Sequence, residues 1–505
     1  MRYALLIAAL VYLLTFGSFL FSSGTLIYLD SVPSLYPERY FAVVFSEANT
    51  WGAASLASLP YHVLALLGSS LLPAFLFREL FLLVCFLAGG AFIFKSLEVN
   101  RQARYLGVLL LLFNPFLYLR IAAAGQLGMV IATVLAPLFL YYLFSYYRAP
   151  TRAQALKLAL AYTLASMFQA HFFILNAIVF LLYSGIVALK REAGIREIGK
   201  ACVAILLVNL YWLAFVPLLR PVAIAGVTEQ HMQFFYPRPS LDLNSAVKLA
   251  GLYGFWREGA VERIYDEVPF YAFIAFVSLL IYLSIHGFLS APGDSRNILF
   301  IILIFLGILL ALAAPDLELK PFRDSHKFAY FTLLGYTYLI PRGIEAHKRF
   351  RLVLVAVAAV LLYFNHMQIL LAGQLHPIDY PGEYREAGMI LNRIEEEVVY
   401  LPWRQYVTYN WSLKAGLDGR IGNPMNAVSK RMVKTGCDPF FDYCFETQEQ
   451  RKIKACLENR STACLRNLSV GYVVIDSCAL VPESYDWVAG EEVFSKKCIR
   501  ILELL

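Results

Sequence analysis

Two groups of charged side chains stand where they can do chemistry. Asp30 lies in a polar loop about eight residues beyond the first long apolar run. A carboxylate partly desolvated by a membrane rim can act as a general base. Arg323 and Lys327 are four residues apart in FRDSHKF, at the head of a late apolar run. In a helix this spacing puts them on one face, and two fixed cations there suit a lipid phosphate.

Other polar side chains occur at turns between apolar runs. Arg120 and Gln126 bracket one turn, and His171 falls at the tip of a short hairpin. A charge at that depth is costly unless it is paired or near water. Arg120 therefore either approaches a bound phosphate or pairs with a loop carboxylate. His171 and His326 are either substrate contacts or satisfied structural polar residues.

Each candidate also has a plainer structural interpretation. Asp30 can be an ordinary solvated loop carboxylate, with Glu38 as the next candidate for a base. Arg323 and Lys327 can extend toward the lipid headgroups and pair with Asp324. No tight His and Glu spacing such as H-E-x-x-H is present, so the sequence leaves the cofactor open, with a divalent metal as one option and no clear ligand motif for it.

The composition places the chain in the membrane class. It is 59% hydrophobic and only 16% charged, whereas about 25% of residues are charged in an average soluble domain. From Leu375 onward there are 16 basic and 18 acidic residues, which leaves 27 basic and 18 acidic residues in the preceding part. Such a basic excess is typical of cytoplasmic loops. No basic run is long or interleaved with aromatic residues, so nucleic-acid binding is not expected.

The cysteines and glycosylation sequons are concentrated in the last quarter of the chain. Six of the eight cysteines lie there, together with Asn-x-Ser sequons at Asn410, Asn459 and Asn467. Disulfides persist in oxidising compartments, and sequons are used on the outer side of a membrane. We therefore expect an extracellular, disulfide-containing C-terminal domain and a cytoplasmic N-terminus at the plasma membrane.

The apolar runs predict about eleven transmembrane helices. They cover 4–22, 80–95, 105–119, 126–147, 157–170, 172–189, 201–219, 269–289, 298–314, 327–341 and 351–371. A rival assignment makes 61–77 a span and 157–189 one long helix. It places more Lys and Arg outside, so we prefer the first, with 61–77 lying on or dipping into the outer leaflet.

This topology divides the chain into two predicted domains. Residues 1–371 form a transmembrane module with outer loops 23–79, 220–268 and 315–326, and residues 372–505 form an extracytoplasmic α/β domain. In that domain Gly382–Glu397 reads as an amphipathic helix. VVYLPW, SVGYVVIDSC and EEVFSKKCIRILEL read as strands. Six cysteines allow fifteen pairings, so their connectivity is not predicted.

Several segments together carry a family resemblance. They are the first outer loop with Asp30 and a Trp-Gly pair, FNPFLYLRIAAAGQLGMVIATVLAPLFLYYL (113–143), QAHFFILN (169–176), FRDSHKF (322–328) and VVYLPWRQYVTYNWS (398–412). They resemble membrane glycosyltransferases of the GT-C superfamily, closest to its arabinofuranosyltransferase-like and uncharacterised archaeal or bacterial branch.

The resemblance implies a function and roles for the residues. It implies inverting transfer of a sugar from a polyprenyl-phosphate donor, within membrane lipids, to a glycan or glycolipid acceptor on the outer face. Asp30, or else Glu38, would be the catalytic base. Arg323, Lys327 and Arg120 would bind the donor phosphate, and His171, Gln126 and His326 would contact substrate. The superfamily often has two neighbouring acidic residues where this chain has Asp30 alone. The alternative is therefore a non-catalytic transporter or lipid-binding scaffold whose outer domain binds a partner.

Overall fold

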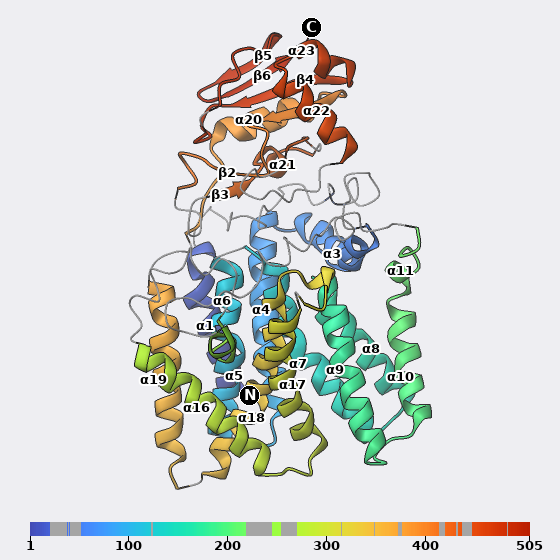
Figure 1. Ribbon diagram of the computed structural model, residues 1–505, viewed down its shortest axis with the longest axis vertical. Coiled ribbons are helices and arrows are strands. Elements are labelled where there is room, and N and C mark those ends of the chain that lie inside the picture. Colours follow the sequence, from blue (N-terminus) through green and yellow to red (C-terminus); the bar gives the residue numbers. More distant parts are fainter. Residues whose placement is uncertain are drawn as a thin grey trace. The chain divides into compact units, whose positions relative to one another are not determined.

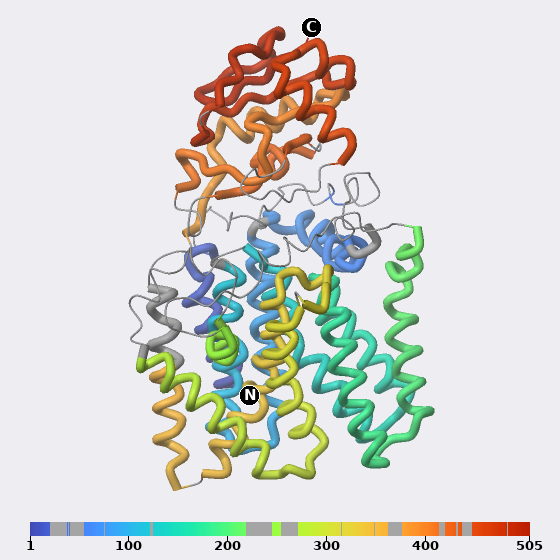
Figure 2. The backbone as a smooth tube through the Cα atoms, in the orientation of Figure 1, coloured from blue at the N-terminus to red at the C-terminus, as the bar shows by residue number. Residues whose placement is uncertain are grey.

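A computed structural model gives the structure of the protein. It describes residues 1–20, 38, 40, 52–122, 125–218, 245–253, 270–314, 316–347, 349–371, 376–413, 420–430, 433–436, 447–481 and 483–504, nearly all of them drawn in colour in Figure 2. The chain divides into two compact units. The helical unit comprises 1–17, 51–61 and 80–373, and the sheet-containing unit comprises 18–50, 62–79 and 374–505.

Helices account for nearly all of the described secondary structure up to residue 371 (Figure 1). They are α1 (Arg2–Leu20), η1 (Gly52–Ser58), α3 (Leu59–Ser69), α4 (Ala74–Ser96), α5 (Arg101–Leu112), α6 (Pro115–Ala122), α7 (Leu127–Arg148), α8 (Arg152–Ser166), α9 (Ala170–Leu189), α10 (Ile195–Val208), α11 (Leu210–Leu213), α14 (Ser245–Ala250), α16 (Phe270–Leu289), α17 (Ser295–Ala313), η3 (Lys320–Phe322), η4 (Ser325–Phe328), α18 (Ala329–Ala346) and α19 (Arg351–Leu371).

The predicted spans coincide with these helices. Among the described residues, seven helices are long and apolar enough to cross a membrane, so the predicted count of eleven is not confirmed. The rival assignment, with 61–77 as a span and 157–189 as one long helix, is wrong in both respects. Residues 157–189 are split between α8 and α9, and a turn at 70–73 separates α3 from α4. An eleven-residue helix is about 16 Å long, which is too short to span a bilayer.

Helix α18 is the centre of the helical unit. Its residues are buried from Ala329 to Ile344, and it packs against α5, α16 and α17. Glycines permit the close approach of α16. A Cβ on Gly287 would lie 2.0 Å from the carbonyl oxygen of Leu339, and one on Gly343 would lie 2.0 Å from that of Leu283. Small residues at helix contacts let backbones approach closely, which suits packing in lipid.

The sheet-containing unit has α20 (Gly382–Leu391), β1 (Glu397–Leu401), β2 (Tyr406–Thr408), β3 (Arg420–Gly422), α21 (Met425–Val428), α22 (Gln448–Glu458), α23 (Thr462–Asn467), β4 (Val470–Asp476), β5 (Glu491–Lys496) and β6 (Ile499–Glu503). Its main sheet has the order β1-β4-β6-β5, with β1 and β4 parallel and the other pairs antiparallel. Strands β2 and β3 form a separate antiparallel pair.

The strands predicted from sequence are present, and the predicted helix is shorter than expected. α20 ends at Leu391 rather than at Glu397. Asn392 turns the chain, and its side-chain oxygen accepts hydrogen bonds from Ser429 and Lys430. Glu397 already belongs to β1, which pairs with β4. The chain must leave the helix to reach this pairing.

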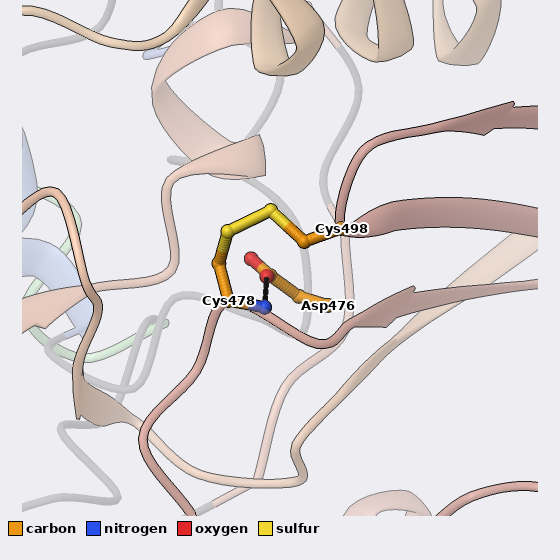
Figure 3. Close-up of side chains that lie close together, drawn as sticks. All are labelled: Asp476, Cys478 and Cys498. Atoms are coloured by element: carbon orange, nitrogen blue, oxygen red, sulfur yellow. Dashed lines mark hydrogen bonds between the residues drawn. A yellow bond between two sulfur atoms is a disulfide. The ribbon is translucent and has the colours of Figure 1, made fainter.

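Two disulfides join described cysteines of this unit, Cys456–Cys464 and Cys478–Cys498. Cys437 and Cys444 lie outside the described residues. The second disulfide lies beside the carboxyl group of Asp476 (Figure 3). These three side chains have ligand atoms within 4.8 Å of one another. Because the two sulfurs are bonded to each other, they offer no thiolate, and the group is not a metal site.

Asp476 is the polar centre of the sheet-containing unit. Only 3% of it is exposed. Its carboxylate accepts hydrogen bonds from the hydroxyls of Tyr384 and Tyr400 and from the backbone N–H of Cys478. Burial raises the pKa of Asp476 to about 6, and the hydrogen bonds from Tyr400 and Tyr384 act in the opposite direction.

This raised pKa predicts a specific pH dependence. The folded unit holds the Asp476 proton more tightly than the unfolded chain does. The resulting stability is fully present below pH 3.8 and is lost as the pH rises through about 6, at most about 3 kcal/mol. We expect Asp476→Asn to remove this dependence. The pH dependence of stability is measured by hydrogen exchange of β4 in the full chain, corrected for intrinsic exchange rates. An unchanged pH slope in the variant would contradict the assignment.

Candidate functional site

The structure brings together most of the side chains singled out in the sequence. Arg120 lies in the last turn of α6, Gln126 precedes α7, and His171 lies in the first turn of α9. Asp324, His326 and Lys327 lie between η3 and the start of α18. We call these residues, together with Arg323, the buried polar cluster, in which Arg120, Asp324, His326 and Lys327 are buried and the other members are half-buried. All of them belong to the helical unit.

An ion pair between Arg120 and Asp324 forms the core of this cluster. Arg120 is fully buried and Asp324 is 5% exposed. Nη1 of Arg120 bonds Oδ2 of Asp324, and Nη2 lies 3.2 Å from Oδ1. The two partners come from segments about 200 residues apart, and a buried arginine is tolerated only when it is paired in this way. Of the two sequence interpretations of Arg120, pairing with a loop carboxylate is therefore confirmed.

The same guanidinium holds two further residues. Nη1 donates to Oε1 of Gln126 at 3.0 Å, and Nη2 donates to Nδ1 of His326 at 3.0 Å. Four of the five N–H groups of Arg120 are thus engaged inside the cluster. Burial tends to raise the pKa of Asp324, but the charges of Arg120 and Lys327 outweigh it and hold that pKa below its ordinary value.

His326 is held in one tautomer. Because Arg120 can only donate, Nδ1 of His326 accepts and the proton lies on Nε2. The backbone of Leu252 and Tyr253 lies close to the ring. Burial, together with the charge of Arg120, lowers the pKa of His326 to about 3. The ring is therefore neutral at physiological pH and serves as a fixed hydrogen-bonding group.

His171 links the α8–α9 turn to the segment that precedes α18. Its Nε2 lies 2.6 Å from the carbonyl oxygen of Pro321, and its Nδ1 lies 3.3 Å from Nε2 of Gln169. The short contact with a carbonyl requires a proton on Nε2. Nζ of Lys327 lies 3.3 Å from the same nitrogen. With its proton on Nε2, this nitrogen does not accept a hydrogen bond from Lys327, so the contact places two donors side by side.

The expectation that Arg323 and Lys327 share one helical face is wrong. Lys327 lies in the 3-10 turn η4, whereas Arg323 follows the separate turn η3. The backbone at Asp324, with φ −82° and ψ 83°, leaves the helical region between them. The side chain of Asp324 is drawn to Arg120, which separates the two turns. Both cations nevertheless lie near His171.

The sequence analysis missed Lys248 as a neighbour of the cluster. This residue is 1% exposed and lies in α14. Its carbonyl oxygen accepts from Gly251 and Tyr253, and it thereby closes the turn whose backbone faces His326. The turn places Leu252 at φ 66°. A single lysine in the long loop 220–268 gives no periodic signal that separates it from solvent-exposed loop lysines.

The two acidic candidates of the first loop have different outcomes. Asp30 lies outside the described residues. Glu38 is described, and its carboxylate lies 3.3 Å from Nζ of Lys430 within the sheet-containing unit. Its side chain is 43% exposed. A base gains from partial desolvation, and this exposed ion pair gives Glu38 less of it than a buried position would.

The ion pair at the core predicts a large stability effect. Replacing Arg120 by Gln leaves the Asp324 charge buried without its partner, and such changes cost about 3–5 kcal/mol. Arg385→Gln is the matched control, because Arg385 and Asp379 form a pair with side chains 48% and 45% exposed. Exposed pairs contribute about 0–1 kcal/mol. Thermal unfolding in detergent compares the two variants.

A double variant completes this test. Arg120→Gln with Asp324→Asn removes both charges, so it should cost less than the sum of the two single changes. Equal Tm values for Arg120→Gln and the Arg385→Gln control would show that the buried pair does not organise the unit.

Comparison with known proteins identifies the fold. No family model matches the sequence, and no curated protein matches it either. The mycobacterial arabinofuranosyltransferase AftD is similar in structure, with a TM-score of 0.54 and 15% identity over 100% of this chain. The match covers 41% of AftD, so this chain spans about two fifths of that protein.

A second solved structure is also similar. The oligosaccharyltransferase of Archaeoglobus fulgidus has a TM-score of 0.47 and 12% identity, over 94% of this chain and 68% of that one. The chain is a multi-pass membrane protein whose fold is similar to that of AftD, in agreement with the resemblance that its sequence motifs carry.

Proposed function

We propose that this protein is an inverting membrane glycosyltransferase. It transfers a sugar from a polyprenyl-phosphate donor to a glycan or glycolipid acceptor on the extracytoplasmic face. The observation that carries this proposal is the buried polar cluster. It contains three cations, Arg120, Arg323 and Lys327, and one carboxylate, Asp324, so its formal charge is +2 without the histidines. A buried positive charge is suited to a phosphate group.

The proposed reaction is a direct displacement at the anomeric carbon. The acceptor hydroxyl oxygen attacks that carbon while the bond to the phosphate oxygen breaks. Asp30 takes the hydroxyl proton, and the lipid phosphate leaves with the electron pair of the broken bond. Arg323 and Lys327 stabilise the negative charge that develops on the phosphate.

The contacts of Arg120 divide the candidate residues between two roles. Arg120 is already engaged with Gln126, Asp324 and His326. We therefore assign it the task of holding these residues in place, rather than direct contact with the donor phosphate. We assign the phosphate to Lys327, which lies beside His171, and to Arg323. We assign His171, Gln126 and His326 to contacts with the substrate.

The proposed topology supports this arrangement. Residues 1–371 form the catalytic module, with loops 23–79, 220–268 and 315–326 on the extracytoplasmic side. Residues 372–505 place the acceptor there. Both described disulfides lie in this second part, as expected outside the cytoplasm. The N-terminus is then cytoplasmic and the membrane is the plasma membrane.

Binding of undecaprenyl monophosphate in nanodiscs tests the phosphate site. Arg323→Gln with Lys327→Gln should weaken its affinity at least tenfold, because each desolvated charge–phosphate contact is stronger than in water. The matched control is Arg148→Gln with Lys190→Gln, which removes two cations at the far ends of α7 and α9. Equal affinities for the two double variants would exclude the proposed clamp.

Asp30→Asn tests the base. We expect transfer from the first polyprenyl-phosphate sugar that the wild type accepts to fall about 10²–10⁴-fold. Affinity for undecaprenyl monophosphate should not change. Glu38→Gln, made in parallel, should retain most activity. Wild-type turnover by the Asp30 variant would assign the base elsewhere. Lipid binding without turnover by the wild type would favour a lipid-binding scaffold.

A further inference from the structure

A chain of buried hydrogen bonds lies next to the polar cluster. The hydroxyl of Tyr330 donates to Oδ1 of Asn176 at 2.6 Å, and Nδ2 of Asn176 donates to Oγ of Ser166 at 3.0 Å. Ser166 in turn donates to the carbonyl oxygen of Phe172 at 3.4 Å. We call Tyr330, Asn176 and Ser166 the relay. Its members belong to α18, α9 and α8.

The relay is buried, so its hydrogen bonds strongly restrict the positions of its members. Tyr330 and Asn176 are fully buried, and Ser166 is 3% exposed. A polar group in such an interior costs free energy unless it is bonded, so each member restricts where the other two can lie. The rings of Tyr330 and Phe172 also contact each other, with centroids 4.8 Å apart. Directional hydrogen bonds, as well as packing, therefore hold these parts of the three helices in position.

The relay joins the segment that contains Lys327 to the segment that contains His171. Tyr330 follows Lys327 by three residues, at the start of α18. Phe172, which accepts from Ser166, is the neighbour of His171. Between these segments Nζ of Lys327 lies 3.3 Å from Nε2 of His171. A shift of α18 against α9 would change this separation directly.

We infer that Tyr330 and Asn176 are positioning residues for the phosphate site. The relay fixes the position of the Lys327 ammonium beside the His171 ring, although no relay member is assigned a contact with the phosphate. This inference rests on the proposed function, because it assigns Lys327 to a lipid phosphate. It predicts that removal of one buried hydroxyl changes the recognition of phosphate.

Tyr330→Phe is the sharpest test, with Tyr338→Phe as its matched control. Tyr338 lies on the same helix about two turns further on. It is 2% exposed, and its ring stacks on Phe300 at 4.0 Å. Both variants lose one buried hydroxyl from α18. Affinities for undecaprenyl monophosphate and for undecaprenol, which has no phosphate, are measured in nanodiscs together with thermal unfolding.

The two lipids separate positioning from general destabilisation. We expect Tyr330→Phe to weaken undecaprenyl monophosphate binding about threefold to tenfold and to leave undecaprenol binding unchanged. Tyr338→Phe should change neither. Equal affinities for the two variants, or an equal loss for both lipids in Tyr330→Phe, would overturn the positioning role. Ser166→Ala, which removes the acceptor of Asn176, provides the second variant if Tyr330→Phe does not fold.

The Arg323 and Lys327 double variant separates this inference from the proposed function. If that variant weakens undecaprenyl monophosphate binding and Tyr330→Phe does not, the phosphate site stands and the positioning role falls. If the double variant also leaves the affinity unchanged, the proposed phosphate site itself is wrong.

Discussion

The candidate site depends on one buried ion pair, that between Arg120 and Asp324. Neither charge is stable alone in an apolar interior, so each segment is held in place by the other. Once Arg120 is fixed, it holds Gln126 and selects the tautomer of His326. Once Asp324 is fixed, the backbone breaks between η3 and η4 and directs Arg323 and Lys327 separately. The positions of Arg323 and Lys327 thus depend on the Arg120–Asp324 ion pair, which includes neither of them.

The pair also shows how a charged site is stabilised in a membrane protein. The cluster carries more positive than negative charge, which is unfavourable in a buried position unless an anion completes it. The two histidines do not add to this excess of positive charge. Each presents a ring nitrogen that is oriented by a hydrogen bond. Such a site is organised before its ligand arrives, and the cost of organisation is met by folding rather than by binding.

Much of the helical architecture could be predicted from the sequence. Lipid accepts only helices whose backbone is internally bonded, so long apolar runs such as 126–147 and 172–189 correspond closely to α7 and α9. The strands β1, β4 and β6 were also predicted, because short β-branched runs favour buried strands. Asp30 remains a prediction, since it lies outside the described residues.

The errors and omissions have a common physical cause. The expectation that Arg323 and Lys327 share a helical face relied on local spacing, and the structure shows that Asp324 between them pairs with a distant arginine. Lys248 and the Tyr330–Asn176 bond were missed because no local periodicity marks them. Interactions between residues far apart in sequence decide which polar groups become buried. A single sequence read for hydropathy and spacing does not contain that information.

The most direct test of the account is a cryo-EM structure in nanodiscs with undecaprenyl monophosphate. The account predicts density for the phosphate within hydrogen-bonding distance of Arg323 and Lys327, next to His171, with the Arg120–Asp324 pair intact. Phosphate density away from both cations, or an Arg120 that leaves Asp324 to bind it, would contradict the account.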